Sequence, residues 1–106
     1  MPLFLHKTFT YMIAALGAMY LLLAGCMANM PVQEMSNARQ SIQAAVDVGA
    51  EHYAHNLLVE ARELLDEASE ELESGNYPLA RQRALEAKEH ALKARQTAMA
   101  KTRDKP

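Results

Sequence analysis

The residue with the most distinctive chemistry is Cys26, the only cysteine among the 106 residues. A lone thiol cannot form a disulfide within its own chain, so an exported protein needs another fate for it. The cysteine closely follows an apolar run of about 14 residues from Tyr11 to Ala24, which is shorter than the ~20 residues of a membrane-spanning helix. Before that run stands a short segment whose one fixed charge is Lys7. A basic start, a short apolar run and small residues at its end predict a cleaved signal peptide over residues 1–25.

The residues directly around the cysteine distinguish between the classes of export signal. Leu23-Ala24-Gly25-Cys26 resembles the bacterial lipoprotein lipobox, Leu-(Ala/Ser)-(Gly/Ala)-Cys, at every position. The resemblance implies that Cys26 is the lipidation site, and that the signal peptidase recognises Leu23, Ala24 and Gly25 and cleaves before the cysteine. It also implies acylation of the new amino terminus, and several acyl chains hold a protein on a membrane where one binds only marginally. The alternative is an incidental cysteine in an anchor helix.

The residue after the lipobox bears on which membrane would hold the protein. Asp at this position is the best-known inner-membrane retention signal of bacterial lipoproteins, and this chain has Met27. The sequence therefore predicts a lipid anchor in the cell outer membrane, with the body facing the periplasm. Attachment to the inner membrane remains the alternative.

The composition of residues 26–106 predicts helices in one small domain. These 81 residues have no tryptophan, abundant alanine and few glycines and prolines, as helices that pack closely require. Loss of the leader removes one basic residue, Lys7, and leaves 10 basic against 13 acidic residues, a net charge of −3. This charge does not favour a nucleic-acid partner.

Apolar periodicity divides the mature chain into a lipidated tether, a helical domain over residues 34–101 and a basic tail. The segments expected are a tether at 26–33, helices at 32–48, 55–74 and 78–101, a connection at 49–56 with room for one helical turn, and a tail at 102–106. Gly49 is predicted to end the first of these helices, and Gly75 and Pro78 to form a tight turn between the other two. In the connection, Tyr53 is expected to fold back onto the core.

The helix at 78–101 carries an apolar row made only of alanine. Its members recur at steps of four and three residues: Ala80, Ala84, Ala87, Ala91, Ala94 and Ala98. Such a heptad seam allows two backbones to approach more closely than larger side chains would. Because the turn before it is short, this helix must lie antiparallel to the preceding one. The sequence predicts an all-α fold, a small antiparallel bundle of three helices with an alanine-rich hairpin.

Charge differs between the two helices of the hairpin. Helix 55–74 is acidic and helix 78–101 is basic, so pairing across the hairpin is expected, with solvated faces as the alternative. A turn centred near residue 76 places residues whose numbers add to about 152 side by side. The expected pairs are Glu71 with Arg81, Glu63 with Lys88 or Glu89, and Glu60 with Lys93.

Other reactive side chains do not form a catalytic or metal-binding set in the sequence. His52 and His55 stand three residues apart beside Glu51, but zinc needs three or four ligands and a second shell, so solvent-facing histidines are expected. The acidic row lacks the spacing of a calcium loop. The serines have no histidine base at a recognisable spacing. We therefore expect no enzyme activity, no metal and no cofactor other than the covalent lipid.

Three stretches of the mature chain carry a resemblance to a known family. They are PVQEMSNARQSI at 31–42, GAEHYA at 49–54 and GNYPLA at 75–80. With the Leu and Ala periodicity between them, the chain resembles the proteobacterial lipoproteins of domain-of-unknown-function family 4398. The resemblance implies a helical domain and supplies no catalytic residues.

Together these observations predict a membrane-anchored periplasmic lipoprotein that acts as a structural or protein-interaction module of the cell envelope. The expected partners are the membrane, through the lipid, and an envelope protein or a second copy of the chain. The helix at 32–48 and the outer side of the alanine-rich helix are the expected docking surfaces. Alternatives are a metal-responsive or envelope-stress accessory protein using His52 and His55, or an accessory subunit of a cell-wall enzyme or transport complex.

Overall fold

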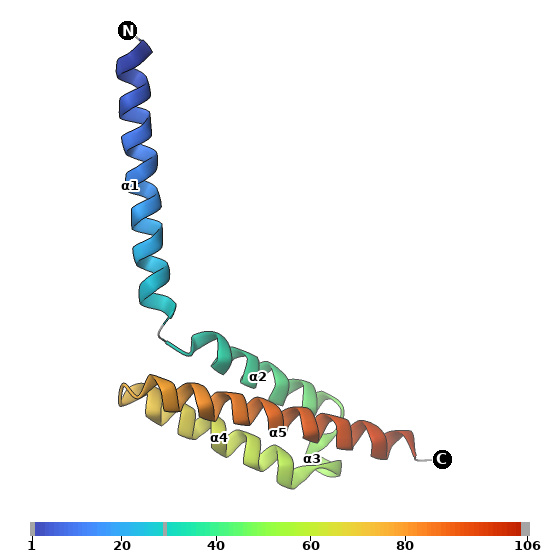
Figure 1. Ribbon diagram of the computed structural model, residues 1–106. Coiled ribbons are helices and arrows are strands. Elements are labelled where there is room, and N and C mark those ends of the chain that lie inside the picture. The colour runs from blue at the N-terminus through green and yellow to red at the C-terminus, as the bar shows by residue number, and fades with distance from the viewer. Residues whose placement is uncertain (1, 29, 105–106) are drawn as a thin grey trace. The chain divides into compact units, whose positions relative to one another are not determined.

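The computed structural model describes residues 2–28 and 30–104, with side chains described for residues 5–22 and 30–104. These residues form no strand, and their helices are α1 (Pro2–Ala28), α2 (Val32–Asp47), α3 (Ala50–Tyr53), α4 (His55–Glu73) and α5 (Tyr77–Arg103) (Figure 1). The predicted all-helical class is therefore confirmed. The chain divides into two compact units, Met1–Met30 and Pro31–Pro106.

The first unit contains the helix α1, which covers the predicted leader. The helix continues through Gly25 and Cys26 to Ala28. Every described side chain from residue 5 to residue 22 is exposed, including large apolar ones such as Phe9 and Leu16. Among the described residues, no helix has the length and apolar character needed to cross a membrane.

The second unit is built around α5. This helix packs against both α4 and α2, and α2 also contacts α4 (Figure 1). The six alanines predicted as a seam are all fully buried, which confirms that this face of α5 is the inner one. Because alanine side chains are short, α5 can lie close to two helices at once.

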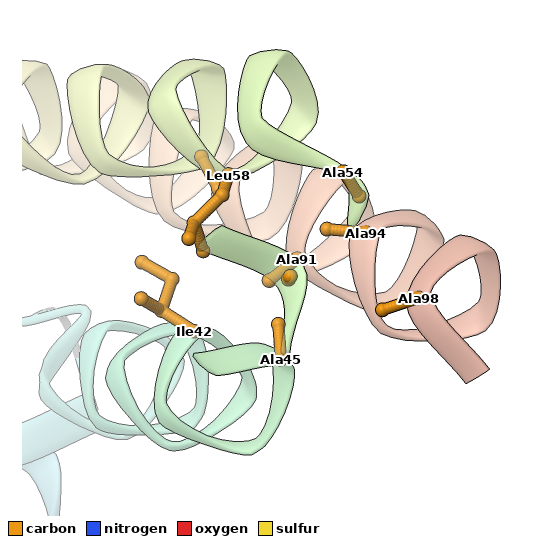
Figure 2. Close-up of a cluster of buried hydrophobic side chains, with 9 residues drawn as sticks. Ile42, Ala45, Ala54, Leu58, Ala91, Ala94 and Ala98 are labelled. Atoms are coloured by element: carbon orange, nitrogen blue, oxygen red, sulfur yellow. The ribbon is translucent and has the colours of Figure 1, made fainter. Parts of the chain in front are cut away.

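The largest apolar side chains of the core come from the helices around α5. Leu58 of α4 is fully buried, and it points toward Ile42 of α2 with Ala91 of α5 beside the two (Figure 2). A second cluster joins Met35, Ala68 and Ala84, one residue from each of the three long helices. The other leucines of α4 are half-buried: Leu57, Leu64, Leu65 and Leu72.

The turn between α4 and α5 has the hydrogen bonds of a Schellman motif. The amide of Asn76 donates to the carbonyl of Glu71 at 2.9 Å, and the amide of Gly75 donates to that of Leu72 at 3.1 Å. Gly75 has φ +82°, in the left-handed region that glycine occupies without strain. Asn76 then caps α5, since its side-chain oxygen accepts from the amide of Leu79 at 3.5 Å. This confirms the predicted turn and adds a cap that the sequence analysis did not assign.

The connection between α2 and α4 is the short helix α3, for which the sequence left room. Gly49 ends α2 as predicted, with φ +89°. A Cβ added at Gly49 would lie 3.3 Å from Cδ2 of Tyr53, whose half-buried ring packs against the core. Glycine is therefore required here both by its backbone conformation and by the ring beside it.

The end of α5 differs from the prediction. The helix was expected to end near Lys101, followed by a basic tail, but it continues to Arg103. The hydroxyl of Thr102 donates a hydrogen bond to the carbonyl of Ala98 at 3.0 Å, so the side chain of Thr102 is bonded to the preceding turn of α5. Residues 105 and 106 of the predicted tail lie outside the described part of the chain.

Candidate functional site

The predicted lipidation site lies near the end of α1. Leu23, Ala24, Gly25 and Cys26 belong to the helix, and their side chains lie outside the described residues. The boundary between the two compact units follows Met30, a few residues after the cysteine. The chemistry assigned to these four residues therefore stays a prediction.

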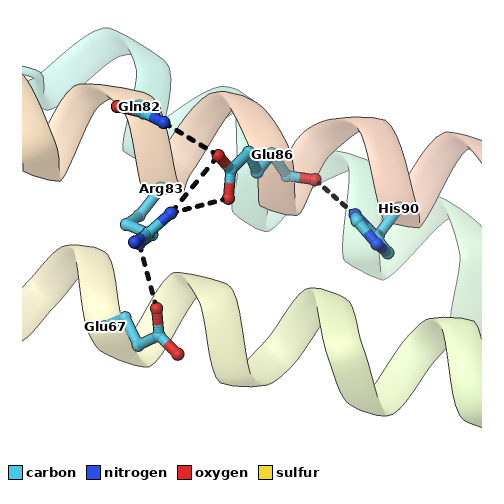
Figure 3. Close-up of polar contacts among 5 residues, drawn as sticks. All are labelled: Glu67, Gln82, Arg83, Glu86 and His90. Carbon is cyan, nitrogen blue, oxygen red and sulfur yellow. Dashed lines mark hydrogen bonds and ion pairs between the residues drawn. The ribbon is translucent and has the colours of Figure 1, made fainter.

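Within the described part of the chain, Arg83 and His90 of α5 contact carboxylates of α4 across the hairpin. Arg83 of α5 places Nε 3.1 Å from a carboxylate oxygen of Glu67 on α4, and its Nη1 lies 3.0 Å from Oε2 of Glu86 one turn along α5 (Figure 3). Farther along, Nε2 of His90 lies 3.3 Å from Oε2 of Glu60, while Nδ1 of His90 faces the carbonyl oxygen of Glu86 at 2.9 Å. Acidic and basic residues thus do meet across the hairpin.

Two of the three pairs predicted within this hairpin, those of Glu60 and Glu63, were wrong. Glu60 faces His90 rather than Lys93, and Lys93 instead lies 3.7 Å from Glu89 on its own helix. Among the described residues, neither Glu63 nor Lys88 makes an ion pair. The reason is the turn: α4 ends at Glu73 and α5 already begins at Tyr77, so facing residues have numbers that add to about 150.

A further ion pair links α5 to α2. Nε of Arg81 lies 3.2 Å from Oε1 of Glu34, and both side chains are about two-thirds buried. Arg81 was predicted to face Glu71 of α4, and its contact with α2 was not predicted. Charge segregation between two helices gave no indication that a third helix would compete for the same arginine.

Glu51 and His52 of α3, and His55 at the start of α4, contact neighbouring side chains. Arg62 of α4 donates a hydrogen bond to Glu51 and holds the pKa of that carboxyl below its ordinary value. Nδ1 of His55 lies 3.8 Å from Glu51, and the ring of His52 meets that of Tyr53 edge to face at 4.7 Å between centroids. In the described part of the chain, no group of three or more His, Cys, Asp or Glu is placed to hold a metal ion.

A shallow groove of about 420 Å³ lies between α2 and α5, and we call it the α2/α5 groove. Its walls are Asn37, Gln40, Ser41 and Ala44 from α2 and Lys88, Leu92 and Arg95 from α5. No acidic side chain lines it, and neither cation makes an ion pair within the described residues. The helix now seen as α2 and the outer side of α5 were predicted as separate docking surfaces, and their meeting in one groove was not predicted. The seven-residue spacing of Lys88 and Arg95 was the feature that could have indicated it.

These features define a small all-helical protein that consists of an apolar first helix and a compact helical body with charged faces. A family model described as a domain of unknown function (DUF4398) matches residues 33–105, which covers nearly all of that body. The chain therefore belongs to this family. No curated protein and no solved structure matches the chain.

Proposed function

We propose that the protein is a lipid-anchored module of the cell envelope, held through Cys26 at the periplasmic face of the outer membrane. The observation that carries the proposal is the position of Leu23-Ala24-Gly25-Cys26 at the end of an apolar helix whose described side chains are all exposed. A helix of this kind suits a leader that is removed, since none of its described side chains, at residues 5–22, is buried.

The proposed role of the body is structural or protein-binding rather than enzymatic. We propose that α2, α4 and α5 act together as an antiparallel three-helix bundle that presents its outer faces to partners. The α2/α5 groove supports a binding role, because its two cations, Lys88 and Arg95, have no ion-pair partner among the described residues. The α2/α5 groove is the surface we assign to binding.

The anchor is tested by replacing the thiol and following the protein through cell fractionation. The full chain with Cys26→Ser should lose incorporation of radiolabelled palmitate, keep its leader and leave the outer-membrane fraction. Serine is nearly isosteric with cysteine but cannot form the stable thioether. If the variant remained in the outer membrane at the level of the unchanged protein, the proposed anchor would be wrong.

A matched variant tests the sorting step separately. Met27→Asp keeps the thiol, so palmitate labelling and cleavage should be unchanged while the protein moves to the inner-membrane fraction. Labelling without this movement would contradict the proposed sorting rule but not lipidation. A binding role is tested in the same cells by crosslinking the membrane-held chain and identifying its partners by mass spectrometry.

A further inference from the structure

The outer face of α5 carries a second apolar row, made of Leu85, Leu92 and Met99. These residues are seven apart, so they lie along one line of the helix, and their exposed fractions are 51, 38 and 39%. The alanine seam on the inner face is fully covered by α2 and α4. One helix therefore has two apolar faces, of which only the inner one is filled within the chain.

The exposed row runs beside the α2/α5 groove. Leu92 belongs to both, since it stands between Lys88 and Arg95 on the α5 wall of the groove. The opposite wall is formed by uncharged side chains of α2, among them Asn37 and Gln40. A helix laid in this groove would cover Leu92 and meet two cations that have no ion-pair partner within the described residues.

We infer that the occupant of the groove is α5 of a second copy of the chain, aligned parallel and in register. Two parallel copies related by a two-fold axis along the helices would place Leu85, Leu92 and Met99 each against its own counterpart. Lys88 and Glu89 lie on opposite sides of the apolar row. In the parallel pair, Lys88 of each copy would therefore face Glu89 of the other copy. The two-fold axis gives two of these Lys88–Glu89 contacts. Arg95 of each copy would face Gln96 of the other copy in the same way.

The charges select the parallel arrangement over the antiparallel one. An antiparallel pair centred on Leu92 brings the Lys88 side of one helix onto the Arg95 side of the other, which places four cations together. Among the described residues of one copy, Glu89 forms an ion pair only with Lys93, at 3.7 Å, and this exposed pair can exchange partners at little cost. The charges on the two sides of the row are therefore complementary between copies in the parallel orientation and repulsive in the antiparallel one.

The acidic helix of the same chain fits the groove less well. Glu63, Asp66 and Glu70 are exposed on α4 and would satisfy the two cations. These acidic residues are three and four apart on the outer face of α4. They take the positions that an apolar row on this face would need. Docking of α4 would leave Leu85 and Met99 uncovered.

The pairing is weak in free solution and strengthened at a surface. Three half-exposed side chains bury less than the ~800 Å² per partner of a standard interface. Copies held on one membrane have a high effective concentration and share one orientation, which favours the parallel pair. This step rests on the anchor proposed above, whereas the identity of the paired surfaces does not.

Cysteine crosslinking in membranes tests both the surface and its direction. The full chain with Leu85→Cys, and separately with Met99→Cys, should form disulfide-linked homodimers on oxidation, because each position meets its own counterpart. Glu63→Cys on the outer face of α4 is the matched exposed control, and the unchanged chain gives the background from Cys26. Equal dimer from Glu63→Cys, no dimer from either position on α5, or dimer only between the two α5 variants mixed together would overturn the proposal. A crosslink from α5 to a different protein in place of the homodimer would also overturn it.

Charge exchange in the Leu85→Cys chain provides a second measurement, which tests the predicted contact between Lys88 and Glu89. Lys88→Glu in the Leu85→Cys chain should lower the homodimer yield about fivefold or more, and adding Glu89→Lys should restore it. Arg39→Glu makes the same charge change on α2 outside the groove and should leave the yield unchanged. An unchanged yield with Lys88→Glu would contradict the pairing.

The two proposals fail in distinguishable ways. If Cys26→Ser stays in the membrane while Leu85→Cys still forms homodimer, the anchor is wrong and the pairing stands. If Cys26→Ser leaves the membrane, and the membrane-held chain with Leu85→Cys and an intact Cys26 forms no homodimer, the pairing is wrong and the anchor stands.

Discussion

Arg83 of α5 contacts Glu67 of α4 across the hairpin, with 3.1 Å between Nε and Oε2. The same guanidinium reaches Glu86, so one arginine joins a contact between helices to a contact within one helix. The alanine seam beneath it offers six side chains of one size, and neighbouring registers of such a seam would bury similar area. The contact of Arg83 with Glu67 therefore adds a preference for one register that the seam itself does not provide.

Removing this arginine should have a small effect that depends on salt. Arg83→Ala is expected to lower the free energy of unfolding by about 0.5–1 kcal/mol at low ionic strength, the range of a partly exposed pair. In 1 M salt, where the screening length is about 3 Å, the difference should shrink toward zero. Chemical denaturation of both chains at the two salt concentrations measures it.

The control is Arg39→Ala, which removes an exposed arginine without an ion pair within the described residues. It should leave stability unchanged in both salts. A loss with Arg83→Ala that persists undiminished in 1 M salt would show that packing, not charge, is responsible.

Much of this fold follows from the sequence because its patterns are local. Alanine steps of three and four residues identified the buried face of α5, and Gly49 and Gly75 stand where the backbone needs positive φ. The partners of charged residues did not follow, since they depend on where a turn closes. The turn is centred one residue earlier than expected, so the pairs Glu67 with Arg83 and Glu60 with His90 have numbers that add to 150 rather than about 152. Arg81 also contacts Glu34, because α2 packs on the same helix.

Substitution in the alanine seam should reveal how little room it leaves. Ala91→Leu adds three heavy atoms at a fully buried position that touches the cluster around Leu58. Overpacking of this kind costs about 1–3 kcal/mol because neighbouring side chains and backbones must shift. Thermal unfolding followed by circular dichroism should show a clear fall in melting temperature.

The matched control is Ala100→Leu, the same change at an exposed position of the same helix. Its effect should stay within about 0.5 kcal/mol. If both variants were equally destabilised, the cause would be helix propensity rather than the close packing of α5.

The two left-handed glycines should differ in their tolerance of a methyl group. Alanine at either site must adopt a conformation that costs about 1–2 kcal/mol for an L-residue. At Gly75 a Cβ meets nothing within 4 Å, whereas at Gly49 it meets the ring of Tyr53 at 3.3 Å. Gly49→Ala should therefore lower the free energy of unfolding more than Gly75→Ala. When each glycine change is made separately in a Tyr53→Ala chain, the two losses of stability should become equal. If Gly49→Ala still lowered stability more than Gly75→Ala, the cause would lie in the backbone and not in the ring.

The contact between Glu51 and Arg62 should make stability depend on pH in the acid range. The hydrogen bond from Arg62, with the arginine's charge, holds the pKa of Glu51 below its ordinary value of 4.5. The folded protein thus binds this proton less tightly than the unfolded chain does. The stabilisation is present above about pH 4.5 and is lost as the pH falls through the lowered pKa. Glu51→Gln should accordingly be less stable than the unchanged protein at pH 7 and nearly equal to it at pH 3, as measured by thermal unfolding at both values.

Glu63→Gln, which removes a carboxylate without an ion pair among the described residues, should not lower stability at pH 7. A deficit in Glu51→Gln that is the same at both pH values would show that the lost packing of the side chain, and not its charge, links α3 to α4.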